Sequence, residues 1–394
     1  MKKIVLFLLF VPLFFSCGGG PSETSYVNEE NTLVVSVPRP DYVNQHFFDA
    51  EKYADSVKFV RLETTDDNLI SNVSELLFAE ESIIVVDYPT ASILFFDYNG
   101  HYLRKIQRRG RGPGEYLELS RVMLDADDNL IVYDAELRAM LYYDSEGKFL
   151  SITEDFCDGM LARDIINLPS GDFLCYRQDD LNREPESKRE FRAGLWVAKK
   201  DGAFDRFIYP FDFEYKSNFV QYNYHLSQLP DGVVSFVDQN QTAVFYIEDD
   251  VVYKRVQFEL PGKTEADFAG QEKQLEGYFA IFTNQEKGDY LFTRWIDDNN
   301  RSFHTILTKS TGELETGMTF NLMAFGEFLP AGSFVRNNNP HILSTWFYPY
   351  AVEEFVQGNF PEEFTSKAQA LIEGIPADQI ENANPILQLL YIKK

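Results

Sequence analysis

The densest group of basic side chains in the sequence surrounds a glycine-rich segment at residues 110–116 (GRGPGEY). Glycine permits positive φ and close backbone approach, and arginine holds carboxylates through two parallel hydrogen bonds. The pattern therefore predicts a site for an anion such as a uronic acid. A structural turn whose arginines pair with surface acids is the alternative. The candidate ligand-binding residues are Arg108, Arg109, Arg111, Gly112, Gly114, Glu115 and Tyr116.

Other motifs with chemical potential are weaker. Pro113 interrupts the glycine run and no helix follows it, so the run is not a dinucleotide fingerprint. Asp125, Asp127 and Asn129 alternate like the start of a calcium loop, but Leu130 stands where such a loop needs glycine. The five histidines are scattered, and no serine-nucleophile motif is present. We therefore assign no catalytic, cofactor-binding or metal-ligating residue.

Aromatic side chains are abundant, and some of them could stack on sugar rings or peptides. The alternative is that these rings pack between sheets. The residues concerned are Tyr222, Tyr224, Trp346, Phe347, Tyr348 and Tyr350.

Two cysteines, Cys157 and Cys175, lie in the body of the chain. An oxidising compartment would permit a disulfide between them, although free cysteine is also often simply buried. The sequence leaves the two alternatives open. The chain has no CxxC pair, which makes a thiol redox role improbable.

An internal repeat of 47 residues predicts the secondary-structure elements that position these residues. Residues 76–103 align without a gap on residues 123–150, with short apolar runs separated by Asp, Asn and Gly. Such runs are typical of strands joined by turns. Looser copies recur downstream and give six units. Four strands per unit at this period predict an all-β fold, a six-bladed β-propeller.

We expect the chain ends to close this ring. The strands at residues 57–62 and 386–392 lack hairpin partners, so they are predicted to complete one blade together. The patterns at residues 264–282 and 362–374 predict short helical insertions between blades. Residues 178–190 are predicted to be a charged, exposed loop.

The first residues of the sequence resemble a targeting signal. Residues 1–16 combine a basic start with a short apolar run, which is typical of a secretory signal peptide and too short to span a bilayer. Ser16 and Cys17 then resemble a lipobox, which predicts acylation of Cys17 and a bilayer as partner. Residues 17–31 are expected to form a flexible tether, and residues 32–394 the propeller domain.

The charge of the chain limits its partners. The formal net charge is −26, which excludes a nucleic-acid binder that relies on a basic surface. An acidic body is repelled by anionic lipid headgroups, so contact with the membrane should come through the tether. We expect a monomeric propeller.

Several segments carry a family resemblance. Residues 97–100 (DYNG), 110–116, 127–134 (DDNLIVYD) and 384–387 (NPIL) resemble the six-bladed β-propeller lipoproteins of Bacteroidetes, relatives of the NHL-repeat propellers. The resemblance covers nearly the whole mature chain and implies a fold and a cell-envelope location, either periplasmic or surface-facing on the outer membrane. It implies no settled activity.

Two functional hypotheses follow. The first is a non-enzymatic, lipid-anchored binding or scaffold module for a glycan, a peptide or an envelope protein, which needs no cofactor. The second is an enzyme of the propeller lyase or lactonase kind with a metal in the central channel.

Overall fold

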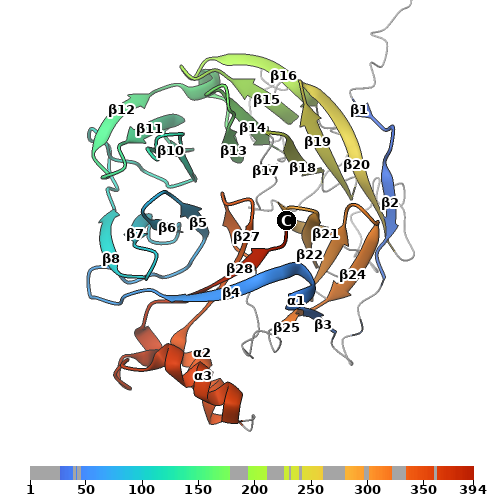
Figure 1. The fold of residues 1–394 in the computed structure, drawn as a ribbon. Helices are drawn as coiled ribbons and strands as arrows, with labels where there is room; N and C mark the ends of the chain where they lie inside the picture. Colours follow the sequence, from blue (N-terminus) through green and yellow to red (C-terminus); the bar gives the residue numbers. More distant parts are fainter. Residues whose placement is uncertain are drawn as a thin grey trace, which may run out of the picture.

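In the computed structural model the chain forms six β-sheets arranged as a ring around a central axis (Figure 1). Each sheet is one blade, so the predicted six-bladed β-propeller is confirmed. The structure describes residues 27–38, 41, 46–177, 194–210, 226–229, 232–238, 242–260, 280–296, 301–321, 334–358 and 362–394.

Blades 1, 2, 3 and 5 are antiparallel sheets whose four main strands follow one another from the axis outward. Blade 1 comprises β5 (Glu75–Phe78), β6 (Ile83–Asp87), β7 (Ser92–Phe96) and β8 (Tyr102–Ile106), and blade 2 comprises β9 (Arg121–Leu124), β10 (Leu130–Asp134), β11 (Ala139–Tyr143) and β12 (Phe149–Thr153). Blade 3 comprises β13 (Asp164–Asn167), β14 (Phe173–Arg177), β15 (Gly194–Ala198) and β16 (Phe204–Pro210), and blade 5 comprises β21 (Ala280–Lys287), β22 (Tyr290–Ile296), β23 (Ser302–Thr308) and β24 (Glu313–Gly317).

Blade 4 is widened by the N-terminal part of the chain. Two short strands, β1 (Val27–Asn28) and β2 (Leu33–Ser36), pair in parallel with its outermost strand. The last residues of the predicted tether therefore lie against blade 4, while residues 17–26 lie outside the described part of the chain. The main strands of blade 4 are β17 (Leu226–Gln228), β18 (Val234–Asp238), β19 (Ala243–Glu248) and β20 (Val251–Glu259).

Blade 6 closes the ring as the sequence predicts. The outermost strand β4 (Ala54–Arg61) comes from the N-terminal side and pairs antiparallel with β28 (Ile386–Ile392), which pairs with β27 (Ile342–Phe347). The short strand β26 (Arg336–Asn337) lies at the seam and pairs in parallel with β5 of blade 1. A separate parallel pair joins β3 (Phe47–Asp49) to β25 (Thr319–Asn321).

The antiparallel order gives the ring two different faces. The innermost strands begin at one face, which we call the channel face. The hairpins that join the first strand to the second and the third to the fourth turn at the other, which we call the hairpin face. In blade 1, for example, residues 79–82 and 97–101 turn at the hairpin face, whereas residues 88–91 lie at the channel face.

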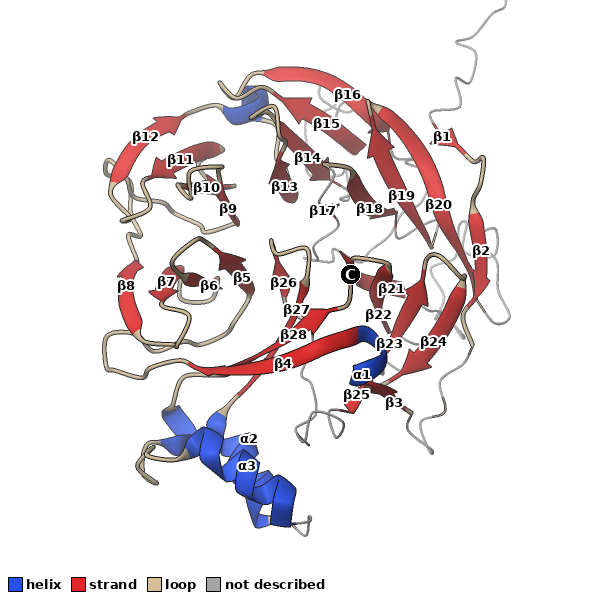
Figure 2. Ribbon diagram, viewed as in Figure 1, coloured by secondary structure: helices blue, strands red, loops and turns tan. Residues whose placement is uncertain are grey.

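In the part of the chain that the structure describes, helices are few and lie at the edge of the ring (Figure 2). The predicted helix at residues 362–374 is present as α3 (Glu362–Ile372), and it packs with α2 (Pro349–Gln357). A single helical turn, α1 (Ala50–Tyr53), precedes β4. Within the described ranges, no helix is long and apolar enough to cross a membrane.

One predicted helix needs correction. Residues 280–282, at the end of the range 264–282, begin strand β21, because their backbone pairs with β22. Residues 264–279 lie outside the described part of the chain, as does the charged loop expected at residues 178–190.

Candidate functional site

Three consecutive blades place a charged residue at the same point of the innermost strand. Glu75, Arg121 and Asp164 are the first residues of β5, β9 and β13, and each pairs with the next-to-last residue of the adjacent strand. Because the register is the same in each blade, the three side chains meet at the channel face near the axis.

These charges contact one another from blade to blade. The guanidinium of Arg121 pairs with the carboxylate of Glu75, and its Nε lies 3.3 Å from Oδ1 of Asp164. The same Nε donates to the carbonyl oxygen of Ile165 at 3.0 Å. The hydroxyl of Tyr88 donates to Glu75 at 2.9 Å. The contacts therefore link blades 1, 2 and 3.

Arg336 extends the group across the channel. Its Nη1 lies 2.7 Å from Oδ1 of Asp164, and its Nη2 donates to the carbonyl oxygen of Leu226 in blade 4 at 2.7 Å. The backbone N–H of Leu226 donates to the other oxygen of Asp164 at 2.9 Å. The seam of blade 6 is thereby joined to blades 3 and 4, and we call Glu75, Arg121, Asp164 and Arg336 the axial cluster.

The axial cluster is buried and electrically balanced. The exposed fraction is 1% for Glu75 and Asp164 and 5% for Arg121. Burial alone would raise the pKa of Asp164, but the charges of Arg336 and Arg121 hold it below its ordinary value. Two carboxylates against two guanidinium groups leave the cluster neutral, which buried charges require.

This donor set does not suit the channel metal of the lyase-like hypothesis. Divalent cations in enzymes are held by several carboxylates or imidazoles with an open position. Here both carboxylates are engaged by arginines, which would repel a cation. Among the residues that the structure describes, no group of three or more His, Cys, Asp or Glu could hold a metal.

Lys287 is a further buried charge near the axis. Its Nζ donates to Oδ1 of Asn337 at 3.1 Å and to the carbonyl oxygen of Asn339 at 2.5 Å, which joins blade 5 to the seam of blade 6. Burial, followed by the nearby charge of Arg336, lowers the pKa of Lys287 to about 7. Among the residues that the structure describes, no carboxylate pairs with this amine, so burial favours its neutral form.

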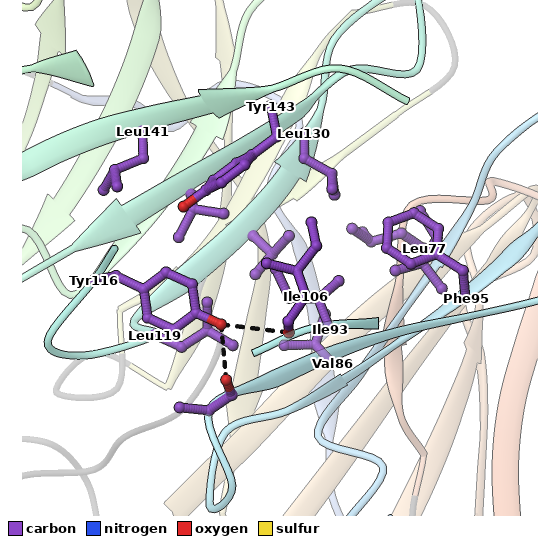
Figure 3. Close-up of a cluster of buried hydrophobic side chains, with 14 residues drawn as sticks. Leu77, Val86, Ile93, Phe95, Ile106, Tyr116, Leu119, Leu130, Leu141 and Tyr143 are labelled. Atoms are coloured by element: carbon purple, nitrogen blue, oxygen red, sulfur yellow. Dashed lines mark hydrogen bonds between the residues drawn. The ribbon is translucent and has the colours of Figure 1, made fainter. Parts of the chain in front are cut away.

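The glycine-rich loop predicted as a ligand site connects blade 1 to blade 2 at the channel face. Its two ends are held together because the N–H of Gly110 donates to the carbonyl of Tyr116, and that of Tyr116 to the carbonyl of Arg108. The ring of Tyr116 is buried between the blades, and its hydroxyl donates to the carbonyl of Ala91 at 2.8 Å (Figure 3). Tyr116 is therefore the anchor of the loop, not a surface contact.

The single acid of the loop is turned toward its own backbone. Glu115 Oε2 accepts the N–H of Gly112 at 2.8 Å. A Cβ at Gly110 would lie 2.0 Å from the same oxygen, so a side chain there would displace the Glu115 carboxylate. Gly114 adopts φ +73° against the ring of Phe149. The glycines are thus explained by packing around Glu115 and Phe149, which does not require a ligand.

The three exposed arginines of the loop do not pair with surface acids in the described structure, contrary to the alternative interpretation of the sequence. Arg108, Arg109 and Arg111 are exposed, and within the described chain none of their side chains has a hydrogen bond or ion pair. The neighbouring Arg104 is instead engaged, since its guanidinium lies 4.2 Å from the ring centre of Phe95. We call Arg108, Arg109 and Arg111 the arginine triad.

An aromatic ladder stands at the same face, where β27 leads into α2. Trp346 packs edge-on against Tyr348 at 4.9 Å, and Tyr348 stacks on Tyr350 at 5.5 Å with 17° between the ring planes. The hydroxyl of Tyr348 donates to the carbonyl of Ser71, which precedes β5. Tyr350 is 41% exposed, so a ring reaches the surface. Phe347 packs inward, and Tyr222 and Tyr224 lie outside the described residues.

The remaining sequence candidates lie outside the axial cluster or outside the described residues. Cys157 and Cys175 are both free and buried, and Nε1 of Trp196 donates to Sγ of Cys157. Asp125 accepts the backbone N–H groups of Asp127 and Asn129, as in a tight turn at the hairpin face. Cys17 lies outside the described residues.

The sequence-based site contained none of the axial cluster. The signal that marks the cluster is a charged residue at the start of an innermost strand, which is unusual in a chain that buries strands between blades. That signal appears only once the strand pairing is known.

The fold and site together define a six-bladed β-propeller whose centre is crossed by ion pairs. Residues 33–391 match the family model described as Domain of unknown function (DUF4934), and the chain belongs to this family. No curated protein matches the chain in sequence.

Solved structures of low sequence identity share the fold. The crystal structure of a candidate exported protein from Bacteroides fragilis is 17% identical with a TM-score of 0.68, covering 92% of this chain and 100% of that one. A member of the duf4221 family from Bacteroides vulgatus is 10% identical with a TM-score of 0.53, covering 86% and 98%. A periplasmic gluconolactonase of Pseudomonas aeruginosa is 12% identical, with a TM-score of 0.40 and coverage of 71% and 82%. That last likeness supports no inference about activity.

Proposed function

We propose that the protein is an exported, lipid-anchored binding module without catalytic activity, and that its ligand is an acidic glycan held at the arginine triad. The observation that carries the proposal is the state of the triad. In a chain with 62 acidic residues, Arg108, Arg109 and Arg111 project from one loop without an acidic partner in the described structure. Guanidinium groups of this kind suit two-point contacts with carboxylates.

The loop is built to hold the triad in place. Tyr116 fixes the base of the loop between two blades, and Glu115 closes it from within. A loop that is already ordered loses little conformational entropy when a ligand binds. The arrangement therefore favours binding over a purely structural role for the arginines.

The aromatic ladder supports a saccharide over other anions. Tyr350 offers an exposed ring at the channel face, the same face as the arginine triad. Aromatic rings present a flat apolar surface with a polar edge, which suits the face of a sugar ring. Carboxylates for the arginines and a ring for the tyrosines are both features of uronic-acid glycans.

Export and anchoring rest on other observations. Residues 1–16 read as a signal peptide and Cys17 as an acylation site, and the Bacteroides fragilis neighbour is described as exported. The absence of catalysis is inferred from the axial cluster, in which every carboxylate is held by an arginine.

Binding by calorimetry to an acidic oligosaccharide, tetragalacturonate, and to a neutral one, maltotetraose, tests the proposal. We expect the acidic sugar to bind, the neutral sugar not to bind, and the affinity to fall with added salt. The triple variant Arg108→Ser, Arg109→Ser and Arg111→Ser should weaken binding at least about tenfold, because each charge-assisted contact contributes about 1.5–3 kcal/mol.

A charge-matched control separates the loop from the net charge. Lys148, Lys199 and Lys200 are exposed at the hairpin face, and changing all three to Ser alters the net charge equally. This control should bind like the unaltered protein. Equal weakening in both triple variants, or failure of the acidic sugar to bind at all, would contradict the proposal.

A further inference from the structure

The N-terminal part of the chain joins the ring at the face opposite the proposed site. β1 and β2 run parallel to β20, and Val27 pairs with Val252, next to the hairpin at Asp249 and Asp250. From there the chain continues as β2, which runs alongside β20 toward the channel face, where Ser36 pairs with Glu259. Val27 therefore lies at the hairpin face, on the outer edge of blade 4.

The length of the preceding segment limits where an anchor can be. Ten peptide steps separate Cys17 from Val27, and they span at most about 35 Å when fully extended. β20 has nine residues, and such a strand is about 30 Å long. A tether turned back toward the channel face would use nearly all of its reach on the height of the blade. Full extension also costs conformational entropy, so an anchor at Cys17 would be favoured on the hairpin side.

The charge of the hairpin face determines how closely it approaches lipid. Its turns carry more exposed acids than exposed lysines. The acids are Glu80, Glu81, Asp127, Glu146, Asp201, Asp249 and Asp250, and the lysines are Lys148, Lys199 and Lys200. Anionic headgroups repel such a surface, but only within about a Debye length of 8 Å at physiological salt. Electrostatic repulsion therefore keeps the hairpin face a short distance from the headgroups, but it is too short-ranged to reverse the orientation of the propeller.

We propose that acylated Cys17 holds the propeller over a bilayer with the hairpin face toward the lipid and the channel face away from it. The proposal rests on the anchoring proposed above and deepens it. Its consequence is that the arginine triad and the aromatic ladder face outward from the membrane. A large glycan can then reach them without meeting the headgroups.

Two single cysteine variants in blade 2 test the orientation. Asp127→Cys places a label at the hairpin face and Glu118→Cys at the channel face, and both positions are exposed acids. Cys157 and Cys175 are buried, so the protein without new cysteines serves as the labelling control. Each full-length acylated variant is labelled with a donor dye and reconstituted in phosphatidylcholine vesicles that carry an acceptor-labelled lipid.

We expect clearly greater energy transfer to the lipid from position 127 than from position 118. Equal transfer, or greater transfer from position 118, would overturn the orientation. Mass spectrometry of the N-terminal peptide reports acylation independently. A protein without acyl chains on Cys17 would overturn the anchor and the orientation together, whereas acylated protein with equal transfer overturns the orientation alone.

Discussion

Arg336 and Asp164 join opposite sides of the ring, with 2.7 Å between Nη1 and Oδ1. Arg336 lies at the seam of blade 6, and Asp164 begins the innermost strand of blade 3. Within the described ranges, the apolar clusters between blades join neighbouring blades, and none of them spans opposite blades. The pair therefore acts as a strut that fixes the width of the channel.

Removing the arginine from this pair should be costly. We expect Arg336→Met to lower the free energy of unfolding by about 3–5 kcal/mol, because it leaves a buried carboxylate without one of its two cationic partners. Urea unfolding at pH 7 measures the change. Arg255→Met removes a half-exposed arginine from Glu248 and should cost less than about 1 kcal/mol. Equal losses in the two variants would contradict the role of the strut.

The same pair predicts a loss of stability in acid. The folded pKa of Asp164 is lowered, so its ionised form contributes stability that is complete above the ordinary value of about 3.9. That stability is lost as the pH falls through the lower folded pKa. Unfolding curves at pH 7 and pH 3 should diverge more for the unaltered protein than for Asp164→Asn. A pH dependence that is the same in both proteins would show that Asp164 does not titrate as described.

Burial of Lys287 predicts that the free energy of unfolding changes between neutral and alkaline pH. Between its folded pKa of about 7 and the ordinary value of 10.5, the unfolded chain holds a proton that the folded chain lacks. The free energy of unfolding therefore rises with pH over this range. We expect the stability of the unaltered protein to increase relative to Lys287→Met by a few kcal/mol between pH 7 and pH 10. Urea unfolding across the range measures the difference, and a constant difference would contradict the prediction.

The repeat predicted the blades but concealed the axial cluster. The ungapped alignment sets Glu75 opposite Val122, whereas the strand pairing makes Glu75 equivalent to Arg121. The difference arises because the turn after β9 is one residue longer than the turn after β5. A slip of one residue turns a side chain to the other face of a strand, so the charges did not align in sequence.

The ends of the chain show what local patterns can and cannot predict. β28 was recognisable because it is an apolar run without a hairpin partner, and β4 is the matching run at the other end. The parallel addition of β1 and β2 to β20 depends on contacts more than 200 residues apart, such as Val27 with Val252. No local periodicity reports such pairing, so the segment read as part of a tether.

Strand β28 should be essential for a closed ring. Leu389 is 1% exposed and packs in the cluster shared by blades 6 and 1. We expect Leu389→Ala to cost about 2–5 kcal/mol through the cavity it leaves. The exposed Leu150 lies on the outermost strand of blade 2, and Leu150→Ala should cost far less. Thermal unfolding of both variants provides the measurement, and similar midpoints would show that the closing strand contributes little.

Tyr116 links the stability of the blades to the presentation of the arginine triad. Tyr116→Phe keeps the buried ring but removes the hydroxyl, which leaves the carbonyl of Ala91 without this donor (Figure 3). We expect a loss of about 1–3 kcal/mol in the free energy of unfolding. Because the triad itself is untouched, affinity for tetragalacturonate should fall only through looser ordering of the loop, by less than the tenfold loss of the triple variant.

Tyr143→Phe removes the donor to Gly114 from the opposite side of the loop and should act in the same direction. A variant that stays folded but loses all binding would contradict this prediction. The hydroxyl removed in that variant would then belong to the ligand-binding surface and not to the anchor of the loop.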